Sequence, residues 1–304
     1  THAHPLVDRE AYLAVCGVLP TTPKKRSALW SARLEVEAAP TSPIRRETMG
    51  ACYHPSFRNI RTKETTRMSK ALQDAYRIVH VHKGSCLALD TETTGINCRT
   101  DEIIELAVLR LTQEGGTLRR EEMDEFIRLS PGRKLPAMIT NLTGMTEQML
   151  ADDGLEKPVV AERFAELLRA GRTLIVAYNA QFDLCFLYFF LRAHGMADAL
   201  RGVKMLDAMT VYKDRRPYPH KLANAVEAYR LQTQNTHRAI DDATATLELL
   251  EAMEAECADL ERYINLFGYN PRFGAPKPAI GSIIYKPQGY DRMGKLYEEE
   301  LTFV

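Results

Sequence analysis

The order of apolar segments between Gly84 and Leu266 is the feature that most restricts how this chain can fold. Three segments with strand character follow one another closely, so we expect an antiparallel meander, with the charged stretch 115–122 forming the turn before the third strand. Two more apolar runs then alternate with helical patterns. The five predicted strands span residues 85–90, 102–111, 123–130, 173–179 and 203–209. This order predicts an α/β fold, a mixed five-stranded sheet with an antiparallel meander plus parallel strands, flanked by helices.

Helical spacing of apolar residues predicts four helices around these strands. The most apolar of them ends at Gly195, and the last is expected to run without interruption to Leu266. The four predicted helices span residues 159–170, 181–195, 220–231 and 239–266.

We divide the chain into three parts. Residues 1–67 are rich in Pro, Thr and Arg without a sustained period, and residues 1–82 carry 13 Lys or Arg against 7 Asp or Glu. We expect a poorly structured basic extension there, a solvated arm or an aid to phosphate contacts, with Met68 as a native start. Residues 68–266 form the predicted domain. Residues 267–304, rich in Gly, Pro and aromatics, are expected to pack on the core or dock a partner.

Composition excludes several classes of protein. No segment reaches the ~20 apolar residues of a membrane span, and the apolar run at 11–20 follows acidic residues, unlike a signal peptide. The six cysteines show no CxxC pair or zinc-site spacing, and Cys86 and Cys185 lie in apolar runs. We therefore expect a cytoplasmic protein in a reducing compartment, with no membrane contact.

Two carboxylates lie at the end of the first predicted strand. Asp90 and Glu92 are two residues apart, so both point to the same face of the sheet. An isolated pair of this kind is usually only a polar strand end. The residues Thr93, Thr94 and Gly95 then form a turn in which backbone amides and a hydroxyl can approach a substrate closely.

Asp183 lies in the first turn of the most apolar helix. A buried acid is unfavourable there unless it caps the helix or binds a cation, and both interpretations are open. Asn179 and Phe182 flank it, one able to hydrogen-bond and the other to pack.

The third acidic segment places His237 just ahead of the last predicted helix and Asp242 one turn inside it. Asp241 points about 100° away around the helix, toward solvent or Arg238. Clustered carboxylates that hold two divalent ions, together with a base that deprotonates water, are what phosphodiester hydrolysis requires. The three segments therefore favour a metal-dependent nuclease.

The three segments resemble motifs I, II and III of the DEDD (DnaQ-like) exonuclease superfamily. His237, Ala239 and Asp242 match the His-x-Ala-x-x-Asp motif of its DEDDh branch, whereas Arg238 stands where another branch has a tyrosine. The resemblance runs from about Ser85 to Leu266 and includes the LTGMT sequence at 142–146.

The resemblance implies a ribonuclease-H-like fold and 3′→5′ release of nucleoside 5′-monophosphates with two Mg²⁺ or Mn²⁺ ions. It implies metal binding by Asp90, Glu92 and Asp242, with Asp183 acting on the second ion through water, and His237 as the base. The turn at 93–95, with Asn179 and Phe182, is expected to bind the terminal nucleotide of single-stranded or frayed DNA.

Other functions use similar residues. An exonuclease acting on RNA or oligoribonucleotides is the first alternative, because pocket shape decides the response to a 2′-hydroxyl. A catalytically silent nucleic-acid-binding module, or one associated with a DNA polymerase, is the second. A haloacid-dehalogenase-type phosphatase is disfavoured, because it needs an aspartate where Glu92 stands. The sequence leaves the oligomeric state and a polymerase partner open.

Overall fold

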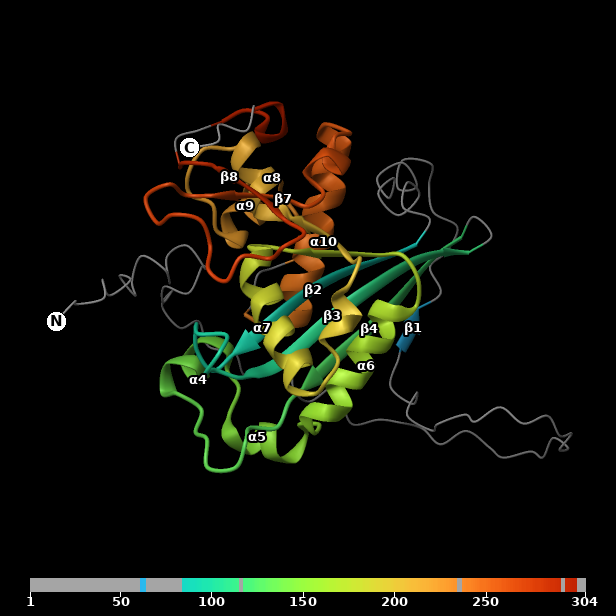
Figure 1. The fold of residues 1–304 in the computed structure, drawn as a ribbon, viewed down its shortest axis with the longest axis vertical. Helices are drawn as coiled ribbons and strands as arrows, with labels where there is room; N and C mark the ends of the chain where they lie inside the picture. Colours follow the sequence, from blue (N-terminus) through green and yellow to red (C-terminus); the bar gives the residue numbers. More distant parts are fainter. Residues whose placement is uncertain (1–60, 64–83, 115–116, 234–236, 291–292, 300–304) are drawn as a thin grey trace, which may run out of the picture.

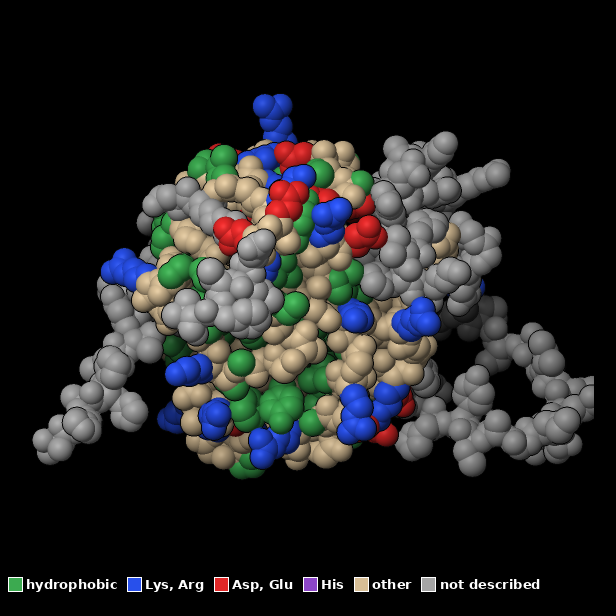
Figure 2. All heavy atoms as spheres, turned by 45° about the horizontal axis from the view of Figure 1, so that its top comes forward, with side chains coloured by type: hydrophobic (Ala, Val, Ile, Leu, Met, Phe, Trp, Pro, Cys, Tyr) green, Lys and Arg blue, Asp and Glu red, His purple; other side chains and the backbone are tan. Residues whose placement is uncertain are grey.

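A computed structural model describes residues 61–63, 84–114, 117–233, 237–290 and 293–299 (Figure 1, Figure 2). Only three residues of the predicted N-terminal extension are among them, and the expectation for the rest of that extension lies outside the described residues. No helix in the described part of the chain is long and apolar enough to cross a membrane. The four described cysteines, Cys86, Cys98, Cys185 and Cys257, are free thiols.

The central sheet has six strands in the order β1-β4-β3-β2-β5-β6. β1, β4, β3 and β2 pair antiparallel, and β2, β5 and β6 pair parallel. The strands are β1 (Arg61–Lys63), β2 (Ser85–Thr93), β3 (Ile103–Glu114), β4 (Thr117–Phe126), β5 (Thr173–Ala177) and β6 (Lys204–Asp207). The predicted mixed five-stranded sheet is confirmed, and β1 adds a short edge strand beside β4.

The turn expected at 115–122 is wrong in its extent, because β4 already begins at Thr117. Glu114 pairs with Thr117, which leaves only two residues between the strands. Charged residues of β4 form ion pairs, as Glu121 does with Arg110 on β3 at 2.9 Å and Glu125 with Arg163 at 2.5 Å. The first half of β4 is mostly charged, so it lacks the alternation of apolar residues on which the strand prediction depended.

Helices cover both faces of the sheet (Figure 1). They are α4 (Ala137–Thr143), α5 (Glu147–Asp152), α6 (Lys157–Arg169), α7 (Ala180–Ala193), α8 (Ala208–Arg215), α9 (Leu222–Ala228) and α10 (Ala239–Glu256). Leu87 and Leu89 of β2 face a core shared with α6 and α7. Cys86 and Ala88, one residue out of phase, face a second core shared with α8, α9 and α10. Because β2 is buried on both faces, it reads in the sequence as a continuous apolar run.

The last helix is shorter than predicted. α10 ends at Glu256, Cys257 adopts an extended conformation, and a separate 3-10 helix η2 (Leu260–Tyr263) follows. The guanidinium of Arg215 on α8 donates to the backbone carbonyls of Met253 and Cys257. The Met253 carbonyl also accepts from the Cys257 amide at 3.0 Å, so the Arg215 side chain adds a second donor at the end of the helix and one to the carbonyl just past it. A contact from another part of the chain therefore helps to end this helix, and local spacing cannot reveal it.

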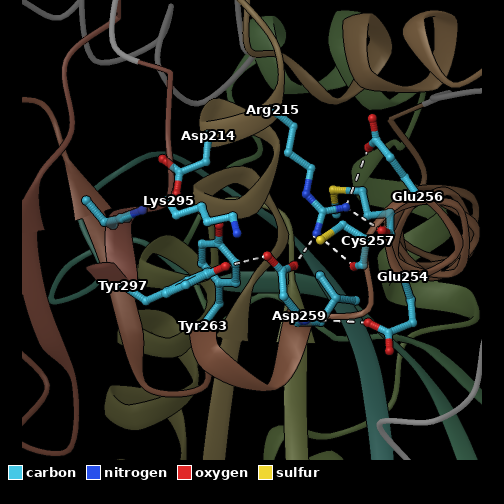
Figure 3. Close-up of polar contacts among 12 residues, drawn as sticks. Asp214, Arg215, Glu254, Glu256, Cys257, Asp259, Tyr263, Lys295 and Tyr297 are labelled. Carbon is cyan, nitrogen blue, oxygen red and sulfur yellow. Dashed lines mark hydrogen bonds and ion pairs between the residues drawn. The ribbon is translucent and has the colours of Figure 1, made fainter. Parts of the chain in front are cut away.

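The tail after Leu266 contains a two-stranded parallel sheet, β7 (Leu266–Tyr269) and β8 (Ile284–Pro287), and a 3-10 helix η3 (Leu296–Glu298). Its apolar residues enter the two cores, Phe267 and Ile283 in the first and Leu266 and Leu296 in the second. Buried polar groups of α8 and η2 hold the last part of the tail (Figure 3).

Candidate active site

Five residues from three distant segments line one open cleft, whose empty volume is about 690 Å³ including its mouth. They are the five residues that the sequence analysis singled out for catalysis: Asp90, Glu92, Asp183, His237 and Asp242. Asp183 and Asp242 are buried, and the other three are half-buried. The structure therefore places all five around one space.

The alternation of β2 explains how these side chains converge. Asp90 and Glu92 continue the phase of Ala88, which faces the core shared with α10, and α10 carries Asp242. Thr91 points the other way, toward α7. Its amide and hydroxyl donate to one carboxylate oxygen of Asp183 at 3.1 and 2.7 Å.

Of the two sequence-based interpretations of Asp183, helix capping does not describe its main contacts. The N-cap position of α7 belongs to Asn179, whose side chain makes no capping bond. The carboxylate of Asp183 is 2% exposed and bonds to Thr91 on β2. This leaves an acid held against the strand that carries Asp90.

The electrostatics of the cleft favour a cation. Burial raises the pKa of Asp90 well above its usual value, and the charges of Asp183, Asp242 and Glu92 raise it further. Burial and the charges of Asp242 and Glu105 likewise raise the pKa of Glu92. Burial also raises the pKa of Asp183 to about 7, although its bonds from Thr91 act in the opposite direction. Carboxylates crowded in this way repel each other unless a positive ion lies among them.

Three of the five side chains are close enough to share one ion. Ligand atoms of Glu92, His237 and Asp242 all lie within 4.8 Å of one another. The carboxylates of Asp90 and Asp183 line the same cleft outside this group. Carboxylate oxygens suit Mg²⁺ and Mn²⁺, so the donor set fits the ions that the sequence implies, and the histidine lies beside them.

Glu105 is a residue of the site that the sequence analysis missed. Its side chain is fully buried on β3, directly opposite Glu92 in the strand pairing. It accepts bonds from the Arg238 guanidinium, at 3.0 and 2.6 Å to one oxygen and 3.2 Å to the other, and from the Ala239 amide at 3.2 Å. The Arg238 guanidinium also lies 4.9 Å from the centre of the Phe126 ring.

These contacts fix the start of α10 beside the cleft. His237 adopts a left-handed backbone conformation with φ 56°, which a residue without glycine's freedom adopts only when its surroundings impose it. Arg238, the next residue, is anchored by Glu105. In the sequence, the one signal for Glu105 is that a charged residue stands inside an apolar predicted strand.

Four of the five residues predicted to bind the terminal nucleotide line the cleft: Thr93, Gly95, Asn179 and Phe182. Thr94 is not among the lining residues, because its hydroxyl accepts a bond from the Glu102 amide at 2.9 Å. Gly95 is closely packed against the Asp101 side chain. A Cβ there would lie 2.4 Å from a carboxylate oxygen of Asp101.

One wall of the cleft is apolar and was also missed by the sequence analysis. It consists of Ile96 after β2 and of Met138, Ile139 and Leu142 on α4. Met138 is exposed although apolar, as expected of a residue that borders a binding site. The wall offers a non-polar surface beside the acidic centre, and Tyr178 and Phe182 add two aromatic rings.

A mixed sheet whose central strand ends in a cleft lined by four carboxylates and a histidine has the features of a hydrolase active site. Residues 87–250, more than half of the chain, match the RNase_T family, described as exonuclease. The chain belongs to this exonuclease family, and its ribonuclease-H-like α/β fold and its resemblance to DnaQ-like exonucleases are confirmed.

The relatives include DNA polymerases, and this chain matches only a small part of their length. The DNA polymerase III PolC-type of Lacticaseibacillus paracasei is 31% identical over 191 residues, and that of Bacillus subtilis is 32% identical over 192 residues. These matches cover 62% and 61% of this chain but only 12% of either polymerase.

Solved structures show the same fold at lower identity. Escherichia coli Exonuclease I in complex with a dT13 oligonucleotide superposes with a TM-score of 0.53 and 19% identity, over 59% of this chain and 43% of that one.

Proposed function

We propose that this protein is a 3′→5′ exonuclease that hydrolyses single-stranded or frayed DNA from its 3′ end and releases nucleoside 5′-monophosphates. The observation that carries this proposal is the convergence of Asp90, Glu92, Asp183 and Asp242 with His237 on one cleft. A buried acidic cluster of this kind lowers stability in the absence of a cation, and a phosphodiester hydrolase needs such a cluster.

The four carboxylates would hold two divalent ions, Mg²⁺ or Mn²⁺, which when bound supply an activated water and neutralise charge on the phosphate. His237 lies close to Glu92 and Asp242 and would accept the proton of the attacking water. Thr91 keeps Asp183 in place through two hydrogen bonds. Glu105 keeps Arg238, and with it His237, at the edge of the cleft.

The shape of the cleft supports binding of a nucleotide at a chain end. The turn at Thr93 and Gly95 would meet the terminal 3′-hydroxyl. The apolar wall of α4 together with Phe182 would contact the base. An unpaired end reaches these groups without breaking base pairs, which favours single-stranded or frayed substrates.

DNA is the substrate that the comparisons support. The relatives with PolC-type names are DNA polymerases, and the solved Exonuclease I structures include complexes with dT13 and dA16 oligonucleotides and a zinc-bound complex with single-stranded DNA. A polymerase partner fits the PolC-type relatives, although this chain spans only a small part of them.

A matched pair of 5′-labelled single strands, one DNA and one RNA, tests the proposal. We expect stepwise shortening of the DNA from its 3′ end with release of 5′-monophosphates, dependent on Mg²⁺ or Mn²⁺ and blocked by a 3′-terminal phosphate. Faster shortening of the RNA would assign the enzyme to RNA ends. Tight binding without hydrolysis in either metal would show a silent binding module instead.

A further inference from the structure

A group of exposed aromatic residues lies outside the cleft. Tyr218, in the loop between α8 and α9, is 58% exposed, and its ring centre lies 5.0 Å from that of Tyr290 in the tail. Phe273 is 46% exposed, and the Arg272 guanidinium lies 5.7 Å from its ring centre. Burial raises the pKa of Tyr290, and the nearby positive charge of Arg272 acts in the opposite direction. We call these four residues, Tyr218, Tyr290, Arg272 and Phe273, the aromatic strip.

The loop end of the strip is tied to the cleft. The Tyr178 hydroxyl donates to the backbone carbonyl of His220 at 2.8 Å, and Tyr178 lines the cleft. The His220 ring contacts both Tyr218 and Tyr290, with ring centres 5.7 and 6.3 Å apart. A hydrogen bond and two ring contacts therefore connect Tyr178 in the cleft with the strip.

The tail end of the strip reaches the same rim. Gln181, in the first turn of α7, donates to the Pro278 carbonyl at 2.9 Å and accepts from the Tyr285 hydroxyl at 2.5 Å. Gln181 is two residues from Asp183. Figure 1 shows the tail loop that follows β7 descending toward the end of β2 and α7. The two segments that carry the strip therefore contact Tyr178 and Gln181, on the α7 side of the cleft.

The chain around the strip is suited to a polyanion. Residues 215–226 and 264–290 contain no Asp or Glu. Arg272 and Lys277 are exposed, and neither forms an ion pair with another described residue. Cations interleaved with exposed rings are the pattern of a single-strand binding surface.

We propose that the aromatic strip binds the 5′ portion of a single-stranded nucleic acid whose 3′ end occupies the cleft. The inference rests on the proposed function, because a strand held by its 3′ end must leave the cleft along its rim. Bases would stack on Tyr218 and Phe273, and Arg272 would pair with the backbone phosphates. Arg272, Phe273 and Tyr290 lie beyond the residues 87–250 that match the family, whereas Tyr218 lies within them.

Length-dependent binding tests the inference separately from catalysis. Fluorescence anisotropy in Ca²⁺ would compare oligothymidylates of about 3 and about 12 nucleotides on the wild type and on a Tyr218→Ala/Phe273→Ala variant. We expect the variant to bind the longer strand roughly tenfold or more weakly, since stacking of one base changes affinity by about 5- to 150-fold. Binding of the shorter strand and hydrolysis of a dinucleotide should stay unchanged.

Matched variants keep the result interpretable. Tyr218→Leu/Phe273→Leu retains apolar volume without a planar ring and should lose as much affinity as the alanine pair, whereas Tyr218→Phe should keep it. Tyr188→Ala removes a ring that is 41% exposed on α7 and should bind as the wild type does. Equal affinity of the wild type for both lengths, or an equal loss in Tyr188→Ala, overturns the inference. Length-dependent binding without any hydrolysis would overturn the proposed function and leave the strip assigned.

Discussion

Carboxylates are buried both in the cleft and beneath the tail, but their neighbours differ. Hydrogen-bond donors surround those beneath the tail, whereas other carboxylates surround those in the cleft. Beneath the tail, Asp214 of α8 accepts bonds from the Tyr263 hydroxyl at 3.0 Å, the Gln288 side-chain amide at 2.7 Å and the Leu296 backbone amide at 2.5 Å. Asp259 binds Arg215 at 2.5 Å and the Tyr297 hydroxyl at 2.7 Å (Figure 3). In the cleft, the carboxylates of Asp90, Glu92 and Asp242 raise one another's free energy.

The difference separates a structural polar network from a functional one. A buried acid surrounded by donors fixes the parts that supply those donors, here α8, η2 and the tail. A buried acid surrounded by other acids is unfavourable until a cation arrives, and it persists because the two cores around β2 hold it there. Removing an acid should therefore have opposite effects on stability in the two regions.

The largest effect is expected from Asp242→Asn. Loss of one carboxylate from the acidic cluster should reduce kcat at least about a thousandfold, because ion binding contributes several kcal/mol to transition-state stabilisation. In EDTA the same variant should melt at or above the wild-type temperature, since it removes a charge that repels Asp90 and Glu92. Mononucleotide release and thermal melting measure both effects.

Asp241→Asn is the matched control, because Asp241 is the adjacent acid and does not line the cleft. It should keep nearly all activity. Wild-type rates in purified Asp242→Asn would remove the assignment of this cleft.

Asp214→Ala should have the opposite signature. Three donors lose their acceptor in a buried place, so we expect a loss of about 3 kcal/mol in the free energy of unfolding. Urea denaturation measures this loss. Glu298→Ala, at an exposed position on η3, provides a control that should change stability little. If Asp214→Ala lowered the free energy of unfolding no more than Glu298→Ala does, the bonds to Asp214 would not stabilise the tail.

Local periodicity predicted the five strands and the apolar helix α7. The convergence of the three acidic segments was expected from their chemistry and from the family resemblance. They could not predict the length of α10, which Arg215 helps to end, or the start of β4, where charged residues hide a strand. The role of Glu105 was also hidden. Its partner Arg238 is far away in sequence, and only the folded sheet brings them together.

Glu105→Gln tests a residue that supports the cleft without lining it. Glutamine keeps the size of the side chain but loses the charge that anchors Arg238, so His237 should be held less firmly. We expect kcat to fall roughly 10- to 100-fold with a smaller change in KM, the range typical of residues that orient metal-site groups. Glu121→Gln, which breaks a half-buried pair with Arg110 on the same sheet, is the control and should leave kcat near the wild-type value. Equal losses in both variants would indicate a general effect on the sheet.

The pH dependence of the free energy of unfolding tests the electrostatics of the cleft. The pKa of Asp183 rises from 3.8 to about 7 in the folded protein, so between these values the unfolded chain holds fewer protons than the folded one. The free energy of unfolding in EDTA should therefore fall as pH rises through this window. Adding Mg²⁺ should restore more stability near the upper end than near the lower end. Melting curves across this range measure the slope, and a rise in stability with pH in EDTA would contradict the electrostatic description of the cleft.

Tyr297→Phe should give the smallest effect and tests the one hydroxyl through which Tyr297 reaches Asp259. The substitution removes the hydroxyl that donates to Asp259 but keeps the ring, which packs edge-on against Tyr263 at 5.1 Å and lies under the Arg262 guanidinium at 5.0 Å. Asp259 still keeps Arg215, so the loss should be about 1 kcal/mol, the usual net value of one hydrogen bond. Urea denaturation resolves such a difference when Tyr269→Phe, whose hydroxyl bonds to no other described residue, is measured alongside. The sign matters more than the size: a single bond removed from the tail should destabilise the metal-free protein, whereas a whole carboxylate removed from the cleft should not. If Tyr297→Phe and Asp242→Asn both lowered the stability of the metal-free protein, the buried acids of the cleft would have to be paired with hydrogen-bond donors, as Asp214 and Asp259 are.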